Sequence, residues 1–576
     1  MRFKLKITHY LLWIVVIGSI FSHQIFIKDD YFRRSLSFIQ NIQYGDYLIQ
    51  KWFLIPISFL TLLFWVISQK GLWKSFAKNL KPIIIIGVIL LISHAASFQR
   101  WFEFDDYRVI GTHYDVIGTD HDYTMGLSNS VWYGIGFVYL VVRWFGTNFA
   151  LYNITGLLIY FFIGITIFFI GKRVQNKSVV AVLASLFFIT SPTYWRQILQ
   201  MQEYIGDGFS LLLFSLAIYL LVSKFYLGAI IFYAAALEFG LSRLHYIAIP
   251  LLLISILLVA KIKSQRWEWV LTLLAFPLIF FLYWPVLVAM RPQVINYSNL
   301  LSNWPHLVRL ADSIFAVSLP HALAYPLINT LRSWFPQAFY ISSILGGVVV
   351  LGLVGLIVWL LKEKRFLAAK LIVIGEVMLI ISMIGPTLSG IRMVQSIQPL
   401  TSQYNDTFPI APTSYGLSAT FGMMIILLGL SLVIKYKIFQ RLLIILILVN
   451  SLTMLHSDTE WAKIYSAPER ASNPQLMHLL PGNGKLKVIY ASPPSEILSR
   501  YIYEFYELYR IREPIYIQND AGEFIKLLEK YQPEKQEVYL FTQDPHTYEI
   551  YDHSEKLRKY YPGQLTPALL KSLTKS

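Results

Sequence analysis

The sequence of 576 residues contains no cysteine. Disulfide bonds, thiolate nucleophiles and metal sites with cysteine ligands are therefore excluded. Charged side chains are also scarce: they make up 14% of the residues, whereas soluble domains carry about 25%. Hydrophobic residues reach 56%, and this combination is typical of a protein that lies in a membrane.

Apolar runs near 20 residues recur along the first 456 positions, and each is long enough to cross a hydrocarbon layer of about 30 Å. Aromatic residues at the ends of many runs suit the membrane interface. The first run lacks a small-residue cleavage site after it, so we interpret it as an uncleaved span. We expect a polytopic α-helical membrane protein with about thirteen spans: 10–27, 52–68, 82–97, 148–170, 178–191, 209–223, 227–241, 245–260, 269–289, 338–361, 366–384, 416–434 and 439–456.

The net charge of +16 does not indicate nucleic-acid binding, because the basic residues follow the predicted spans. With the N-terminus inside, the short inner segments hold 20 Lys and Arg against two acids, and the longer outer segments hold 13 Lys and Arg. This distribution is the positive-inside rule. It predicts a protein of the cytoplasmic membrane, surrounded by lipid, with its C-terminal part outside.

The predicted organisation has three parts. Residues 1–81 form an N-terminal transmembrane hairpin, residues 82–456 form the transmembrane core, and residues 457–576 form a soluble domain outside the membrane. Within the core, residues 131–145 are expected to lie along the outer interface, because a crossing there would invert the orientation of all later spans. The large outer loops, which we expect to carry function, are 98–147, 192–208, 290–337 and 385–415.

The region after Ser457 has a soluble composition. Three short apolar segments, KVIYAS (487–492), PIYIQ (514–518) and EVYLFT (537–542), are typical of buried strands. The two segments between them have helical periodicity. The alternation of strand and helix predicts a small α/β domain with a parallel sheet.

The most informative segment is residues 98–124, FQRWFEFDDYRVIGTHYDVIGTDHDYT, which follows the predicted span 82–97. It holds six acids and two histidines, whereas the other predicted outer loops are poor in acids. Adjacent carboxylates such as Asp105 and Asp106 repel each other, and pairs of this kind are suited to general-base catalysis. The alternative is an ordinary solvated acidic loop. The place of the pair, about eight residues beyond a predicted span, favours the catalytic interpretation.

Residues 82–260 resemble the membrane-embedded glycosyltransferases of the GT-C fold, which include protein O-mannosyltransferases, aminoarabinose transferases and oligosaccharyltransferases. The resemblance consists of the acid pair, the expected interfacial helix, the start of the next span (TNFALYNITGLLIYF) and the outer turn SPTYWRQILQMQEYIGD. The acidic loop follows the third predicted span instead of the first, so residues 1–81 would be an addition. The WWDYG-type signature of oligosaccharyltransferases is absent, which argues against N-glycan transfer to protein.

The resemblance implies a donor sugar on a polyprenyl phosphate and an acceptor that is a glycan, a lipid or a protein. Asp105 or Asp106 then matches the catalytic acid of the family, with Asp105 slightly favoured. That residue deprotonates or positions the acceptor, the anomeric carbon is inverted and the lipid phosphate leaves. No nucleic-acid partner is expected.

Two further groups of residues are candidates for ligand binding. Asp120 and Asp122 form a D-x-D motif, and Glu203 and Asp207 lie four residues apart on the next outer turn. These acids could bind substrate, and Asp120, Asp122 and Glu203 could hold a divalent cation, Mg²⁺ or Mn²⁺; a chance match is the alternative.

Arg243, His245 and Arg392 are candidates for the donor phosphate, because the planar guanidinium suits phosphate geometry. The alternatives are a Glu238–Arg243 pair that holds a turn, and headgroup anchoring.

Other functions stay open at this level. A transporter or a flippase of lipid-linked glycans would place polar residues at mid-membrane in two matching halves. Only Glu376 and Lys370 are deep in predicted spans, and no matching halves are found. A polymerase or ligase of surface glycans would share the large outer loops but depend on Arg and His. The concentration of acids in one outer loop favours the glycosyltransferase.

Overall fold

The computed structural model describes residues 70–102, 144–175, 178–191, 208–240, 274–279, 339–388, 416–434, 436–480, 485–491, 498, 502, 505–506, 515–530, 536–544, 547–560 and 563–574. Its residues group into two compact units. The first unit contains most of the apolar helices. The second contains the residues from Asp458 onward together with the described parts of 96–115 and 142–151. The second unit thus includes residues that the sequence assigned to an outer loop of the core.

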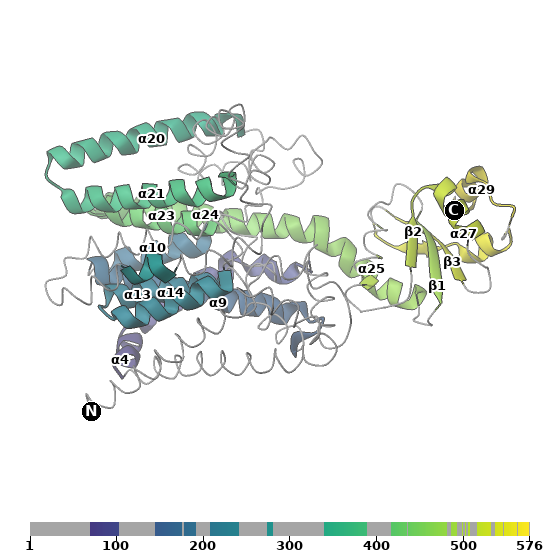
Figure 1. Ribbon diagram of the computed structural model, residues 1–576, viewed down its shortest axis with the longest axis horizontal. Helices are drawn as coiled ribbons and strands as arrows, with labels where there is room; N and C mark the ends of the chain where they lie inside the picture. The colour runs from purple at the N-terminus through teal and green to yellow at the C-terminus, as the bar shows by residue number, and fades with distance from the viewer. Residues whose placement is uncertain are drawn as a thin grey trace, which may run out of the picture. The chain divides into compact units, whose positions relative to one another are not determined.

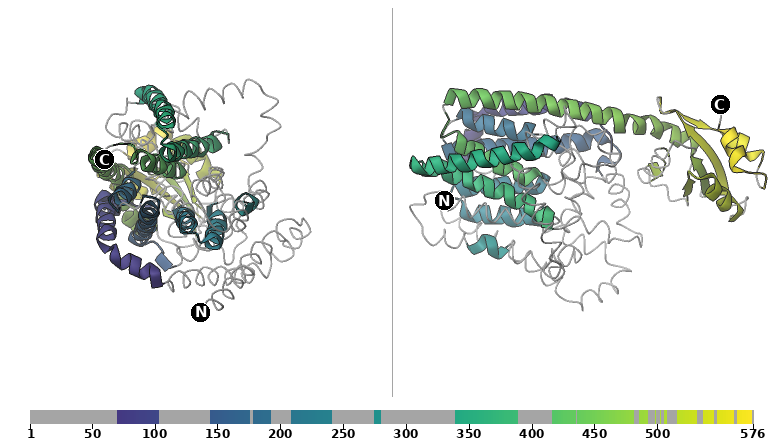
Figure 2. Two further views of the ribbon diagram at one scale, coloured as in Figure 1. Left: turned by 90° about the vertical axis from the view of Figure 1, so that its left-hand side faces the viewer. Right: turned by 90° about the horizontal axis from the view of Figure 1, so that it is seen from above.

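The first unit is helical, and apart from α4 its helices have roughly aligned axes (Figures 1 and 2). Its elements, in chain order, are α4 (Lys70–Lys78), α5 (Leu80–Ser93), α9 (Phe149–Gln175), α10 (Ser178–Thr190), α13 (Phe209–Val222), α14 (Tyr226–Gly240), α20 (Phe339–Lys362), α21 (Phe366–Leu388), α23 (Gly416–Leu430) and α24 (Tyr436–Trp461). Helices α9 and α24 begin or end in the second unit. Apart from α4, these helices lie where the sequence has its apolar runs.

The prediction of about thirteen membrane spans is wrong. In the described part of the chain, two helices are long and apolar enough to cross a membrane, Phe149–Val174 and Lys437–His456. Helices α5, α10 and α13 have 14, 13 and 14 residues. At 1.5 Å per residue they are about 20 Å long, shorter than the hydrocarbon layer of about 30 Å.

The physical reason for this overcount is visible in α10. Its residues from Val180 to Thr190 are buried on almost every side by other helices. A helix that is apolar all round suits the interior of a helix bundle as well as it suits lipid. Composition alone therefore does not distinguish a buried helix from a membrane span.

The basic residues of the long helices lie at defined helix ends. Helix α9 has Lys172 and Arg173 in its last turn. Helix α24 has Lys437 and Arg441 near its start. The opposite ends, at Phe149 in α9 and after His456 in α24, carry no basic residue in the adjoining turn. The two helices therefore have the charge asymmetry that the positive-inside rule requires of membrane spans.

Helix α5 has the same polarity. The Lys172 Nζ atom donates a hydrogen bond of 2.6 Å to Asn79 Oδ1, which places the basic end of α9 beside the start of α5. At the other end of α5, Ser93 Oγ donates a hydrogen bond of 2.9 Å to Ser451 Oγ of α24. Helix α5 thus runs from the basic ends of α9 and α24 toward their other ends. The residues after Ser93 therefore begin at the ends without basic residues.

Two helical hairpins turn on a lysine. In the turn from α13 to α14 the Phe225 amide donates to the Leu220 carbonyl, and Lys224 has a φ of 66°. The turn from α20 to α21 repeats this pattern, with a φ of 56° at Lys364. This is the hydrogen bonding of a Schellman motif, which usually ends on glycine. Lysine at this position places a positive charge at the turn instead.

Helices α21 and α23 pack closely, because glycines without side chains lie where the two helices meet (Figure 1). A Cβ atom added at Gly375 would lie 2.5 Å from Ile426 and 2.6 Å from the Gly422 carbonyl oxygen. One added at Gly429 would lie 2.8 Å from Ile372. Small residues let helix backbones approach each other in this way.

The second unit contains the predicted sheet. Its strands are β1 (Leu486–Ala491), β2 (Ile515–Gln518), β3 (Gln536–Gln543) and β4 (Ile550–Asp552), in the order β2-β1-β3-β4. Strand β1 is parallel to β2 and β3, and β4 is antiparallel to β3. The three predicted strands and their parallel arrangement are confirmed. Helices α25 (Ala467–Leu479), α27 (Ala521–Lys530), α28 (Ser554–Arg558) and α29 (Pro567–Leu573) also belong to this region.

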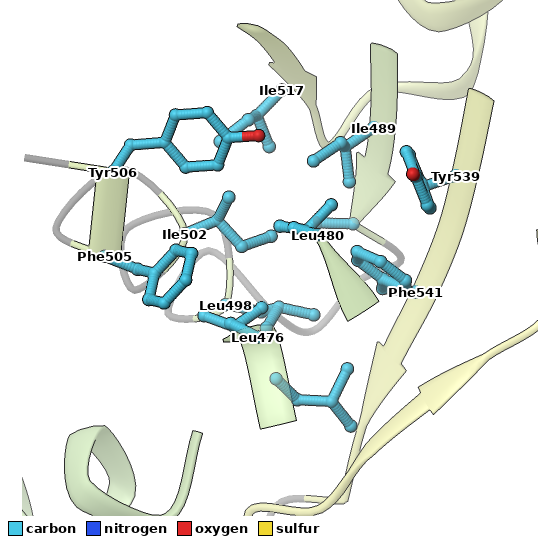
Figure 3. Close-up of a cluster of buried hydrophobic side chains, with 12 residues drawn as sticks. Leu476, Leu480, Ile489, Leu498, Ile502, Phe505, Tyr506, Ile517, Tyr539 and Phe541 are labelled. Atoms are coloured by element: carbon cyan, nitrogen blue, oxygen red, sulfur yellow. The ribbon is translucent and has the colours of Figure 1, made fainter. Parts of the chain in front are cut away.

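Both faces of the sheet are covered, as expected for parallel strands. Successive side chains of β1 point to opposite faces. Ile489 packs in a cluster with Leu476 of α25, with Leu480 directly after that helix and with Phe541 of β3 (Figure 3). On the other face, Val488 and Tyr490 of β1 pack in a cluster with Phe524 and Leu528 of α27. The domain therefore has one core on each side of the sheet.

Candidate functional site

The residues that the sequence predicts for chemistry lie outside the described part of the chain. These are Asp105, Asp106, Asp120, Asp122, Glu203, Asp207, Arg243, His245 and Arg392. The structure neither brings them together nor separates them. It does describe the five residues 98–102, with which the acidic segment begins, and these are called the anchor segment below.

The anchor segment follows the end of α5 directly. Helix α5 ends at Ser93, and a short 3-10 helix, η1 (Ala95–Gln99), follows it. His94 Nε2 lies 3.2 Å from the Ile189 carbonyl oxygen near the end of α10, which holds the exit from α5. The chain continues through the Arg100 amide, which donates to the Ser97 carbonyl. A short 3-10 turn of this kind is common at the end of an α-helix.

A buried ion pair fixes the middle of the anchor segment. Arg100 Nη1 lies 3.5 Å from Asp458 Oδ1, and the two side chains are 1% and 0% exposed. Asp458 is near the end of α24, 358 residues away in sequence. Both charges are removed from water, so their mutual attraction offsets part of the cost of burying them. The pair therefore joins the start of the acidic segment to the end of the second candidate membrane helix.

The end of α24 changes its winding next to this pair. Residues Ala462–Ser466 form a π-helix, η7, between α24 and α25. Pro468 follows it and has no N–H to donate to a preceding turn, so the regular α-helical pattern is interrupted there. In this turn Ser466 is buried, and its Oγ accepts a hydrogen bond of 2.9 Å from the Trp101 amide. Short π segments are frequent at functional sites.

Arg470 of α25 holds the same segment from one turn further on. Its Nη2 donates to the Phe98 carbonyl at 3.2 Å and also to the Arg100 carbonyl. Its guanidinium lies 5.6 Å from the centre of the Trp101 ring. Although the side chain remains in contact with water, burial lowers the pKa of Arg470 from its ordinary value.

Aromatic rings enclose the end of the anchor segment. Phe102 is buried and meets Phe149, the first residue of α9, edge to face with ring centres 5.4 Å apart. Trp101 stacks obliquely near the same ring, at 6.2 Å. Such aromatic pairs contribute about 0.5–1.5 kcal/mol beyond the burial of their surface. The start of α9 and the end of α24 thus both contact the anchor segment.

The sequence interpretation did not single out Arg100, Asp458, Ser466 or Arg470. One signal was present: Arg100 directly follows one apolar run, and Asp458 directly follows another. Charges at such positions are expected to have partners. The pairing itself could not be found, because two segments so far apart in sequence are joined only by the fold.

No metal centre is found among the described residues, which contain no cluster of three His, Asp or Glu side chains. The expected cation ligands Asp120, Asp122 and Glu203 lie outside this part of the chain. Comparison with known proteins adds no relative: no family model, curated protein or solved structure matches the chain.

Proposed function

We propose that the protein is a membrane glycosyltransferase that moves a sugar from a polyprenyl-phosphate donor to an acceptor at the outer membrane face. Asp105 or Asp106 serves as its base. Helices α9 and α24 cross the membrane, with the basic residues Lys172 and Lys437 at their inner ends. The resemblance of residues 82–260 to GT-C transferases motivates the choice of donor.

One observation carries this proposal: the acidic segment begins beside the start of α9 and the end of α24, which are the helix ends opposite Lys172 and Lys437. The anchor segment contacts the start of α9 through Phe102 and the end of α24 through Arg100. By the positive-inside rule these ends face outward. Asp105 follows Phe102 by three residues, so their Cα atoms are at most about 11 Å apart. On this proposal the acid pair lies at the outer ends of the candidate membrane helices.

The reaction can be written with its atoms balanced. An acceptor hydroxyl or amide loses its proton to the Asp105 or Asp106 carboxylate as the new bond to the anomeric carbon forms. The bond from the anomeric carbon to the phosphate oxygen breaks, and the lipid phosphate leaves with the electron pair. The base contributes about 10²–10⁴-fold in rate in reactions of this kind. Positive charge beside the leaving phosphate contributes further, and Arg243, His245 and Arg392 are the proposed source of this charge.

The test is sugar transfer by the purified full chain in lipid, with a panel of polyprenyl-phosphate monosaccharides as donors. Asp105→Asn and Asp106→Asn are compared with Glu523→Gln, which alters an exposed acid of α27. We expect transfer by the wild type and by the Glu523 variant. At least one of the two Asn variants should lose about 10²-fold or more.

Full activity in both single Asn variants and in the double variant would refute the base assignment. Movement of lipid-linked sugar across the bilayer without any transfer would favour the flippase instead.

A further inference from the structure

We infer that Arg470, together with Asp458 and Ser466, is a positioning residue for the acid pair. The inference rests on the proposed function. It assigns a reaction role to residues 458–470, a range that contains none of the catalytic or phosphate-binding candidates. The four contacts described next carry it.

Four contacts join residues 458–470 to three of the five residues of the anchor segment. Asp458 pairs with the Arg100 side chain, and Ser466 accepts from the Trp101 amide. Arg470 donates to the carbonyls of Phe98 and Arg100. The backbone is therefore held from both its carbonyl side and its amide side. Such a backbone cannot shift or rotate without breaking at least one contact.

The arrangement of these contacts suits positioning better than general stabilisation. They hold residues 98–101, which precede the acid pair by four residues or more. All of them come from consecutive turns of one helical stretch, the end of α24, η7 and the start of α25. That stretch continues into Leu476 and Leu480, which are part of the core of the α/β domain. The domain is thus connected to the anchor segment by a short, hydrogen-bonded path.

Arg470 is the residue of this set that a substitution can probe most cleanly. It is exposed, so its loss leaves no buried cavity, unlike a change at Asp458 or Ser466, which are buried. Its planar guanidinium can donate to two carbonyls at once, which a lysine ammonium does less well. A misplacement of about 1 Å at a reacting group can lower the rate by about 10²-fold.

The experiment measures kcat and KM for sugar transfer by the full chain in lipid, for Arg470→Ala, Arg470→Lys and the control Lys526→Met. Lys526 is an exposed cation of α27 that pairs with Glu523 of its own helix. We expect kcat to fall about 10- to 100-fold in Arg470→Ala, with KM within about twofold. The kcat of Arg470→Lys should lie between those of the wild type and Arg470→Ala. Added methylguanidinium should restore part of the activity of Arg470→Ala.

Hydrogen exchange provides a second readout on the same proteins. Amides of residues 98–102 should exchange faster in Arg470→Ala, and those of β1 and β3 should be unchanged. A wild-type kcat in Arg470→Ala, while Asp105→Asn or Asp106→Asn is inactive, would overturn the inference and leave the proposed function standing. An equal loss of protection in the sheet would also overturn it, because the effect would then be on folding. Absence of transfer by the wild type would overturn both.

Discussion

Removal of either charge of the Arg100–Asp458 pair is expected to destabilise the protein by about 3–5 kcal/mol, because the other charge stays buried and loses its opposite charge at 3.5 Å. The structure sets this magnitude. The two side chains are 1% and 0% exposed and their nearest charged atoms are 3.5 Å apart. At an effective dielectric constant of about 20, two unit charges at that distance attract each other by about 5 kcal/mol. The gross attraction and the expected loss are thus of the same size.

A double-mutant cycle in the full chain separates the pair from its surroundings. The variants are Arg100→Met, Asp458→Leu and both together, and the free energy of opening is measured by hydrogen exchange of the segments 96–102 and 458–466. The double variant should be close to the wild type, since replacement of a buried pair by apolar side chains is often neutral or stabilising. Lys526→Met is the control. The Lys526–Glu523 pair is 71% and 58% exposed, so its loss should cost less than about 1 kcal/mol.

Additive effects of the two substitutions on the free energy of opening would refute the reasoning. If the double variant loses the sum of the two single losses, the charges do not compensate each other, and the link between the anchor segment and α24 has another origin. If each single variant loses less than about 1 kcal/mol, water must reach the pair, and its burial would not hold in solution.

Two further predictions concern the separate units. Gly375→Ala should weaken the packing of α21 on α23 by about 1–3 kcal/mol, because the new Cβ would meet backbone at 2.6 Å; Gly352→Ala, which meets no atom within 4 Å, is the control, and thermal denaturation compares them. Burial, with a smaller effect of Lys556, lowers the pKa of His553, whose Nε2 lies 3.0 Å from Thr542 Oγ1. The unfolded chain therefore takes up the proton first, and the domain should lose stability as the pH falls from about 6.5 through the lower folded pKa. His553→Gln should reduce this loss in hydrogen exchange of β3 and β4 between pH 7.5 and 5.5; an unchanged pH dependence would exclude His553 as its source.

Much of the secondary structure could be predicted from the sequence. The apolar run 209–223 corresponds to α13, Phe209–Val222, and the strand segment 537–542 corresponds to β3, Gln536–Gln543. Such segments carry their own signal, either a continuous apolar run or a short run of β-branched and aromatic residues. Strand β4 was not predicted, because three residues are too few to show a period. Helix α25 was missed, because its sequence is polar and contains Pro474.

Two features could not be predicted in the same way: which helices are long enough to cross a membrane, and which contacts hold the anchor segment. Helix α10 is apolar because helices surround it, not because it is long enough to cross a membrane. The contacts of Arg470 and Asp458 depend on where η7 places the following turn. Both features result from packing between segments that are distant in sequence, and local composition does not predict such packing.

Accessibility of single cysteines tests most directly whether the acidic segment lies at the outer membrane face. The chain has no native cysteine, so Gln99→Cys and Glu363→Cys each provide one label site, and both positions are exposed. In sealed right-side-out vesicles, a membrane-impermeant maleimide should label Gln99→Cys at once and Glu363→Cys only after detergent is added. Labelling of Glu363→Cys in sealed vesicles while Gln99→Cys is protected would place the acid pair on the inner side, where an outer-face transferase cannot work.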